Sequence, residues 1–248
     1  MLKIKMNKFD IRIIFLFFFT LDVLSENIGQ PGELFPIKVN KGIFTSSNGL
    51  IKIDNSYYKL VPLSFSKQGQ YVMFEDTKIF IQNKDFGESR ITITNNALVN
   101  LSDEDKDRTI RESKIINKAL QTYSKKMKPT FSFISPVEGI ISSRYGKKRF
   151  INNSPRSPHL ALDIAAPEGT KVLSPEDGKV ILIGNFFYSG NYLIIDHGQG
   201  LLSSYSHLSS ISVSEDDILK QGQEIGKVGS TGRVTGPHLH WTVYYEKV

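Results

Sequence analysis

Glycines that recur between short apolar runs in the second half of the chain are the feature that most restricts the fold. From Phe131 onward, short runs rich in β-branched and aromatic residues alternate with glycines, and no long helical pattern follows Met127. Such runs predict β-strands, and the glycines predict tight turns between them. The clearest strand candidates are Val180–Ile183, Tyr192–Asp196 and Leu201–Tyr205. We therefore expect residues 131–248 to form one all-β domain.

The first half contains a second set of short strands. Ile51, Ile53 and Tyr57–Val61 predict two strands joined through Asp54, Asn55 and Ser56, whose side chains favour turns. Further candidates are Tyr71–Phe74, Lys78–Ile81 and Arg90–Thr94. We expect residues 26–100 to form a small N-terminal β domain of their own.

A single segment, Ser102–Ser124, has helical periodicity. Ser102 can cap the first turn, whose three carboxylates suit the positive end of the helix dipole. Ile116, Leu120 and Tyr123 follow at i, i+4 and i+7, which makes one apolar stripe. The sequence therefore predicts a helix of about six turns inside a connector, residues 101–130, that packs on either domain by this stripe.

Residues 1–25 have the pattern of an export signal. Three lysines in Met1–Lys8 precede the apolar run Ile13–Leu21, and Val23–Ser25 suits a signal peptidase. The run is shorter than the roughly 20 apolar residues of a spanning helix, so we expect cleavage after Ser25 and no stable membrane span afterwards. An uncleaved segment would tether the protein to the membrane. A buried core helix is the alternative, but the charged flanks favour export.

The composition restricts the possible metal ligands more than it restricts the possible binding partners. The formal net charge is +6, and it falls to +4 without the four cations and two anions of residues 1–25. This mild positive charge favours an anionic polymer, although a solvated basic surface explains it equally well. The chain has no cysteine, so any metal must be held by His, Asp or Glu. No aromatic and basic stripe appears, and we therefore expect no nucleic-acid partner.

All five histidines lie in the second half of the chain. His238 and His240 flank Leu239 in a predicted strand, so their side chains point to one face while Leu239 and Trp241 point to the other. Neutral imidazole is the commonest side-chain metal ligand, and a metal would explain the pair. Two exposed histidines on a polar strand face are the alternative.

His159 and Asp163 form a second candidate pair. Fully extended, residues four apart lie roughly 13 Å apart, so the backbone must bend if both are to bind one ion. Pro155 and Pro158 predict that His159 lies at the end of a loop, and Asp163 begins a predicted strand. A surface histidine and a turn-capping aspartate are the alternative for this pair alone.

Together these residues suit a catalytic zinc site, which takes three protein ligands and leaves one position open for water. His159, Asp163 and one member of the pair at 238 and 240 supply three ligands. The other member and His207 then lie beside the open position. His197 precedes Gly198 and is interpreted as a turn residue outside the site.

Residues 131–245 resemble the lysostaphin/LytM-type zinc endopeptidases. The matching blocks, in the order and spacing of that family, are Ser142–Gly146, His159–Gly169, Gly190–Gly200, Tyr205–Leu208 and Gly226–Trp241. Residues 31–120 are more weakly similar to the N-terminal region of a proteobacterial branch, through Arg90–Ile93 and the charged helix.

The resemblance implies a mainly β protein whose C-terminal part is a compact, antiparallel, β-sandwich-like LytM (duplicated hybrid motif) domain. It implies one Zn²⁺ per chain, bound by His159, Asp163 and His240, with His207 and His238 as catalytic histidines. The implied activity is a metalloendopeptidase acting on peptidoglycan stem peptides in the periplasm of a Gram-negative bacterium. The D-alanyl–meso-diaminopimelate cross-link is the first candidate bond, and glycyl–glycine bridges are the alternative.

The resemblance also implies a groove across one sheet, and three further expectations concern this groove. Loops 145–158, 184–191 and 230–237 should frame it, and Phe186, Phe187 and Tyr188 at the second loop either pack on the sheet or form a wall for the substrate. Arg149, Arg156 and Arg233 either meet carboxylates of the stem peptide or are solvated. The N-terminal domain is a candidate cover for the groove or a docking site for a partner.

A function from another class is the alternative. The chain could be a catalytically silent LytM-like module that binds the wall and activates another hydrolase. Silent modules lack ligands, whereas all five site positions hold the expected residue types here.

Overall fold

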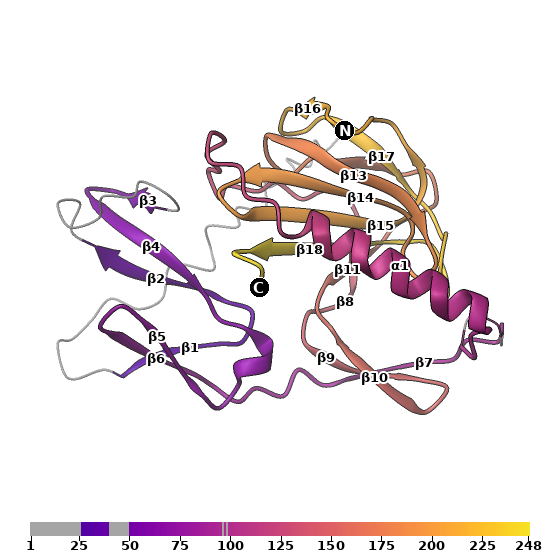
Figure 1. Cartoon of the computed structure of the whole chain (residues 1–248), viewed down its shortest axis with the longest axis horizontal. Coiled ribbons are helices and arrows are strands. Elements are labelled where there is room, and N and C mark those ends of the chain that lie inside the picture. The colour runs from indigo at the N-terminus through magenta and orange to yellow at the C-terminus, as the bar shows by residue number, and fades with distance from the viewer. Residues whose placement is uncertain (1–25, 40–49, 96, 98) are drawn as a thin grey trace, which may run out of the picture.

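The computed structural model describes residues 26–39, 50–95, 97 and 99–248, so the predicted export signal lies outside the described residues. The described chain is mainly β, as predicted, and contains one α-helix, α1 (Asp103–Ala119) (Figure 1). Nowhere in the described ranges does a helix have the length and apolarity needed to cross a membrane.

Two three-stranded sheets make up most of residues 26–81 (Figure 1, left). One has the order β2-β4-β3 and the other has the order β1-β6-β5. Their strands are β1 (Asn27–Gly29), β2 (Leu34–Val39), β3 (Leu50–Ile53), β4 (Ser56–Pro62), β5 (Tyr71–Phe74) and β6 (Thr77–Ile81). The predicted turn between β3 and β4 is confirmed, and Asp54 adopts the positive φ of 52° that Asp and Asn tolerate best.

A buried cluster joins these small sheets to the rest of the molecule. Leu60 of β4 packs with Leu201 and Tyr245 of the C-terminal part, and each of the three side chains is at most 2% exposed. Lys59 adds an ion pair to Glu246 at 2.5 Å. The N-terminal sheets are therefore docked on the C-terminal part through an apolar contact.

Strand β7 (Glu88–Ile91) leaves the N-terminal part and joins a different sheet. It pairs in parallel with β9 (Lys147–Ile151), which pairs in turn with β10 (Ser154–His159). Figure 1 shows this segment running along the bottom of the molecule to the β9–β10 hairpin. A strand predicted within the N-terminal domain thus completes a sheet of the C-terminal part.

Helix α1 begins as predicted but ends earlier. The Ser102 hydroxyl accepts a hydrogen bond from the Asp105 backbone amide at 3.1 Å, which caps the first turn. The helix ends at Ala119 rather than Ser124, because Ser124 hydrogen-bonds the Asp196 side chain and the Gln199 amide and thereby draws the chain onto the sheet.

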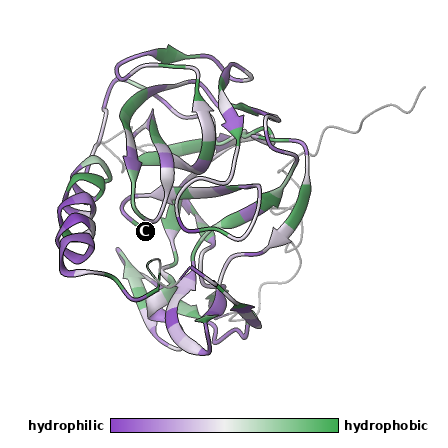
Figure 2. Cartoon of the chain, turned by 90° about the vertical axis from the view of Figure 1, so that its right-hand side faces the viewer, coloured by the Kyte–Doolittle hydropathy of each residue, from purple (hydrophilic) through white to green (hydrophobic). Residues whose placement is uncertain are grey.

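The predicted apolar stripe packs on the C-terminal sheet. Ile116 and Leu120 lie against a buried cluster that includes Phe186, Tyr192 and Ile194. Tyr123, beyond the helix end, is 42% exposed. The rest of α1 is largely hydrophilic, and Figure 2 shows it at the side of the molecule.

A nine-stranded sheet forms the C-terminal part (Figure 1, upper right). Its main path has the order β16-β13-β14-β15-β18-β11-β8, and β17 joins β12 to β15. The strands are β8 (Ile140–Ser143), β11 (Leu162–Ala165), β12 (Lys171–Leu173), β13 (Gly178–Phe186), β14 (Gly190–Gly198), β15 (Leu201–Ile211), β16 (Ile218–Leu219), β17 (Glu224–Val228) and β18 (His238–Tyr245). The three strands predicted most clearly in this region lie within β13, β14 and β15.

Residues 145–158 form mostly a hairpin, and the loop predicted there is wrong. Strands β9 and β10 are joined by Asn152 and Asn153, both with positive φ (48° and 62°), as a two-residue hairpin turn requires. Pro155 and Pro158 lie in β10, which is an edge strand, where a missing backbone N–H costs no ladder hydrogen bond. His159 is therefore the last residue of a strand.

Leu60→Ala should lower the free energy of unfolding by about 2–5 kcal/mol, because it leaves a cavity between the N-terminal sheets and the C-terminal part. Urea unfolding measures this loss. Met73→Ala is the matched control, since Met73 lies in the same N-terminal part and is 62% exposed; its effect should stay within about 0.5 kcal/mol. Equal costs for the two variants would contradict the buried contact.

Candidate metal and catalytic site

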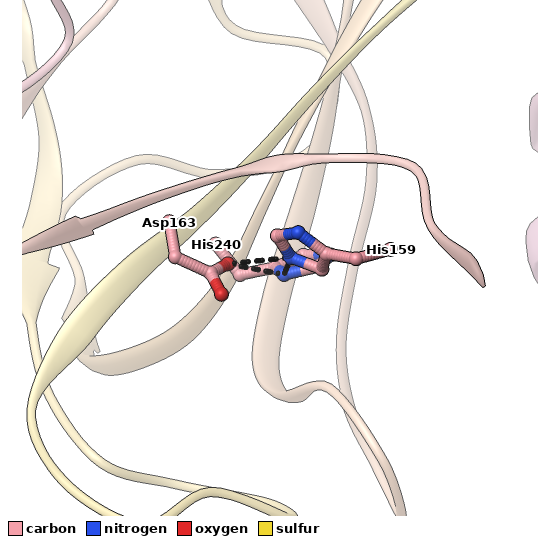
Figure 3. Close-up of side chains that lie close together, drawn as sticks. All are labelled: His159, Asp163 and His240. Atoms are coloured by element: carbon pink, nitrogen blue, oxygen red, sulfur yellow. Dashed lines mark hydrogen bonds and ion pairs between the residues drawn. The ribbon is translucent and has the colours of Figure 1, made fainter. Parts of the chain in front are cut away.

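Three strands bring His159, Asp163 and His240 together (Figure 3). Asp163 in β11 lies directly opposite His240 in β18, so the two side chains share one face of the sheet. His159 ends β10, and the chain bends between β10 and β11 to bring it beside Asp163. The bend that the sequence required is present, and the three predicted ligands converge.

The distances among these side chains fit a single ion. Asp163 Oδ1 lies 2.9 Å from His159 Nε2 and 2.7 Å from His240 Nδ1, and the two nitrogens are 3.3 Å apart. Two ligands held about 2.0–2.1 Å from a tetrahedral zinc ion lie roughly 3.3 Å apart. The donor set of two imidazoles and one carboxylate also suits zinc.

A hydrogen bond to the backbone determines which ring nitrogen of His159 carries the proton. Its Nδ1 lies 3.1 Å from the carbonyl oxygen of Arg144, which can only accept, so Nδ1 carries the proton. In the neutral imidazole this leaves the lone pair on Nε2, the atom that lies 2.9 Å from Asp163 Oδ1. His159 is only 1% exposed. A histidine that binds a metal presents such a lone pair, and a carbonyl that accepts from its other ring nitrogen fixes this tautomer.

The alternation predicted for β18 is confirmed. Leu239 and Trp241 point into the main hydrophobic core, with exposed fractions of 0% and 9%. His238 and His240 point to the opposite face, where His238 Nε2 lies 3.9 Å from Asp163 Oδ1. His238 is therefore close to the cluster without belonging to its shortest contacts.

A backbone irregularity turns His207 toward the same place. Ser206 lies opposite His240 and lines the cavity, so regular alternation would send His207 into the core. Instead β15 changes register at this point, and His207 has a φ of 66°, in the left-handed region. Its amide donates to the Ser189 carbonyl at 2.7 Å. Strain of this kind in a β-bulge is found where a strand re-aims a side chain at a functional site.

Backbone carbonyls also orient the two remaining histidines. His207 Nδ1 donates to the Thr231 carbonyl and His238 Nδ1 donates to the Gly236 carbonyl, each at 2.9 Å. In each neutral ring, Nε2 is thus left as the proton acceptor. The ring centroids of His207 and His238 are 5.0 Å apart, so the two imidazoles lie side by side.

Burial controls the charge state of these groups. Burial and, less strongly, the neighbouring His240 and His238 lower the pKa of His207 to about 3. Burial also lowers the pKa of His240, although Asp163 opposes that effect. For Asp163, burial alone would raise the pKa, but contacts with His159 and His240 outweigh it and hold the carboxylate ionised. Neutral imidazoles and an ionised carboxylate are the forms that bind a metal.

A cavity of about 390 Å³ opens over the cluster. All three segments predicted to frame a groove contribute to it, through Arg149, Tyr188 and Arg233 among others. Ser89, Ile91 and Ile93 of the N-terminal part also line it, which sequence reasoning missed. Nothing in the sequence near β7 indicates its parallel partner, because that pairing joins residues about 60 positions apart.

The aromatic residues of the second loop divide between the two expected roles. Phe186 is 7% exposed and packs edge-on against Tyr192, so it belongs to the core. Phe187 lies near Arg108 of α1. Tyr188 lines the cavity, and the Arg233 guanidinium lies 4.1 Å from the centre of its ring. Only Tyr188 of the three is placed to contact a substrate.

His197 lies outside the cluster, as predicted, but it is a buried residue of β14 rather than a turn residue. It is 2% exposed, donates from Nδ1 to the Asp177 carbonyl and contacts the Ser203 hydroxyl at 2.7 Å through Nε2. Both ring nitrogens are satisfied, which marks a structural residue.

Acidification should destabilise the metal-free protein through His207. The unfolded imidazole takes up a proton near pH 6.5, whereas the folded one, with a pKa of about 3, stays neutral. The free energy of unfolding should therefore fall as the pH drops below about 6.5. Urea unfolding of chelated wild type and His207→Gln between about pH 7 and 5 tests this. A slope no shallower in the variant would contradict a buried neutral His207.

The model of peptidase family M23 matches residues 157–248. Peptidoglycan DD-endopeptidase ShyA of Vibrio cholerae is 44% identical over 102 residues, which cover 41% of this chain and 24% of ShyA. Peptidoglycan DD-endopeptidase ShyB of the same organism is 46% identical over 86 residues, which cover 35% of this chain and 20% of ShyB. The chain thus spans about a quarter or less of the length of these relatives.

A solved structure resembles nearly the whole chain. The crystal structure of a Pseudomonas aeruginosa protein assigned to the M23 peptidases has a TM-score of 0.64 and 28% sequence identity. It covers 91% of this chain, and this chain covers 92% of it. The likeness therefore includes the N-terminal sheets and α1 as well as the C-terminal sheet.

Proposed function

We propose that the protein is a zinc-dependent endopeptidase that hydrolyses peptide cross-links of bacterial peptidoglycan, since the model of peptidase family M23 matches residues 157–248. The observation that carries this proposal is the convergence of His159, Asp163 and His240 beside two further histidines that line one cavity. The names of the similar Vibrio proteins support peptidoglycan as the substrate.

In this proposal His159 Nε2, Asp163 Oδ1 and His240 Nδ1 hold one zinc ion. When bound, zinc supplies Lewis-acid chemistry, which polarises a scissile carbonyl and lowers the pKa of a water. The Arg144 carbonyl keeps the proton of His159 on Nδ1 and so keeps Nε2 available as a ligand.

His207 and His238 move the protons. Each presents an unprotonated Nε2, so either can accept the proton of the attacking water, and the same nitrogen can then donate it to the leaving amine. The carbonyls of Thr231 and Gly236 hold the rings in this tautomer through the cycle. Both rings are oriented in the same way, by a backbone carbonyl at Nδ1.

Substitutions should separate these two roles. His207→Ala should retain about one zinc per chain and lose roughly 10²–10⁴-fold in turnover, which is the size of a general acid–base contribution. Asp163→Ala and His240→Ala should lose the metal itself, because each removes one of three ligands. Metal analysis of purified variants, with release of soluble fragments from purified cell wall, measures both effects.

His197→Asn is the matched control, since it also removes an imidazole from the C-terminal sheet. It should lower stability but keep the zinc content, because His197 lies outside the cluster. Loss of zinc in His207→Ala, or retention of zinc in Asp163→Ala, would contradict the proposed roles. Zinc binding by the wild type without release of wall fragments would favour the silent wall-binding module instead.

We propose the D-alanyl–meso-diaminopimelate cross-link as the bond that is cut, with glycyl–glycine bridges as the alternative. The DD-endopeptidase names of the Vibrio relatives support this choice. Mass spectrometry of digested wall peptides identifies the new termini and decides between the two bonds. Residues 1–25 are proposed to direct export to the periplasm, where this polymer lies.

The N-terminal part is proposed to cover one side of the groove. Ile91 and Ile93 line the cavity, and Asn152 in the β9–β10 turn holds this segment in place. The Asn152 side chain accepts from the Ile93 amide at 2.9 Å and donates to the Ile93 carbonyl at 3.0 Å. These two hydrogen bonds hold Ile93, and with it the segment that covers the groove, against the β9–β10 turn.

Asn152→Gly should therefore raise kcat/KM on intact cell wall, because glycine keeps the positive φ but releases Ile93. Asn153→Gly is the matched control: Asn153 adopts the same backbone region, and it is not the residue that holds Ile93. Digestion rates of purified wall by the two variants test the idea. No increase for Asn152→Gly over Asn153→Gly would rule out a restraining cover.

A further inference from the structure

Arginines gather at one side of the groove and take no part in the mechanism above. Arg149 in β9 lies directly opposite Arg156 in β10, so their side chains share a face. Arg149 and the loop residue Arg233 line the same cavity as the histidine cluster. Like charges at directly opposed positions destabilise a sheet, so this arrangement calls for an anion.

Arg149 is the most constrained member of the group. Its Nε is buried without a hydrogen-bond partner. In the part of the chain that the structure describes, neither Arg149 nor Arg156 forms an ion pair with a carboxylate. Asp163 acts on Arg149 only from a distance, and its charge is committed to the cluster of proposed metal ligands. A half-buried guanidinium of this kind is incompletely satisfied by the protein alone.

Arg233 is held in position by an aromatic ring. Its guanidinium lies 4.1 Å from the ring centre of Tyr188, and its backbone amide donates to the Tyr188 carbonyl at 3.0 Å. The stacking holds this guanidinium at the wall of the cavity. Arg149 and Arg156 lie close enough to lower the pKa of Arg233, although burial is the larger cause. The positive charges of Arg149, Arg156 and Arg233 thus act on the same side of the cavity.

We infer that Arg149 and Arg233 form a subsite for a substrate carboxylate next to the scissile bond, with the exposed Arg156 adding to the field. This inference rests on the proposed function. A guanidinium binds a carboxylate with two parallel hydrogen bonds. Diaminopimelate carries a free carboxylate beside the cross-link, and a glycine bridge carries none within it. The subsite therefore favours acidic cross-links over glycine bridges.

The test compares two synthetic cross-linked peptide dimers that share one scissile bond. In one dimer the diaminopimelate carboxylate is free, and in the other it is amidated. The zinc-loaded wild type should cleave the free acid with a kcat/KM roughly tenfold to a hundredfold higher, the range of charge-assisted hydrogen bonds. Arg149→Gln and Arg233→Gln should each lose most of this preference, because cleavage of the free-acid dimer slows while cleavage of the amidated dimer does not. Arg149→Lys should lie between, because it keeps the charge and loses the two-pronged geometry.

Lys148→Gln is the matched control. It removes the same charge from the neighbouring residue of β9, whose side chain points to the other face, and it should leave both rates unchanged. Zinc content and thermal unfolding confirm that each variant is folded. Equal rates of the wild type on the two dimers would overturn the inference, as would an equal loss on both dimers in Arg149→Gln.

A failure of the proposed function gives a different result. If the wild type cleaves neither dimer, the hydrolase assignment fails, and equilibrium binding of the same two dimers then tests the subsite. Tighter binding of the free acid by the wild type, lost in Arg149→Gln, would support the subsite. Equal binding of both dimers would overturn it.

Discussion

The pairing of β11 with β18 is the constraint on which the site depends. It places Asp163 opposite His240 and Ala165 opposite His238, so two histidines and a carboxylate share one face of a rigid sheet. On the other face, Ile164, Leu239 and Trp241 enter the main core. Slipping the register by one residue would exchange the two faces. Burial of the core therefore holds the polar side chains in register.

Backbone carbonyls orient the histidine side chains of the site. Three carbonyls, from Arg144, Thr231 and Gly236, accept from Nδ1 of His159, His207 and His238. In a neutral ring each contact places the proton on Nδ1 and leaves Nε2 for the proposed metal in the first ring and for the proposed proton transfer in the other two. The positive φ of His207 is the local strain that accompanies this arrangement. A tightly packed sheet can hold such strain, whereas an isolated strand could not.

Sequence reasoning predicted the features that follow from local pattern. The alternation around Leu239, the cap at Ser102 and the turn at Asp54 depend only on neighbouring residues. It failed where contacts between residues far apart in the sequence determine the structure. Helix α1 ends early because Ser124 hydrogen-bonds β14. The prolines that predicted a loop lie in an edge strand. The bulge at His207, the carbonyl partners and the place of β7 depend on pairings that leave no signal in a single sequence. The roles of the five site residues rest on resemblance and geometry together.

The N-terminal part and the C-terminal sheet act as one structure around the groove, since β7 extends the β9–β10 sheet and Leu60 docks on Tyr245. Within this structure, His159, Asp163 and His240 are proposed to bind one ion. X-ray absorption spectroscopy of the zinc-loaded protein at the zinc edge tests it most directly. The account predicts a first shell of only nitrogen and oxygen at about 2.0–2.2 Å, with two imidazole contributions. A shell with fewer or more than two imidazoles would contradict it.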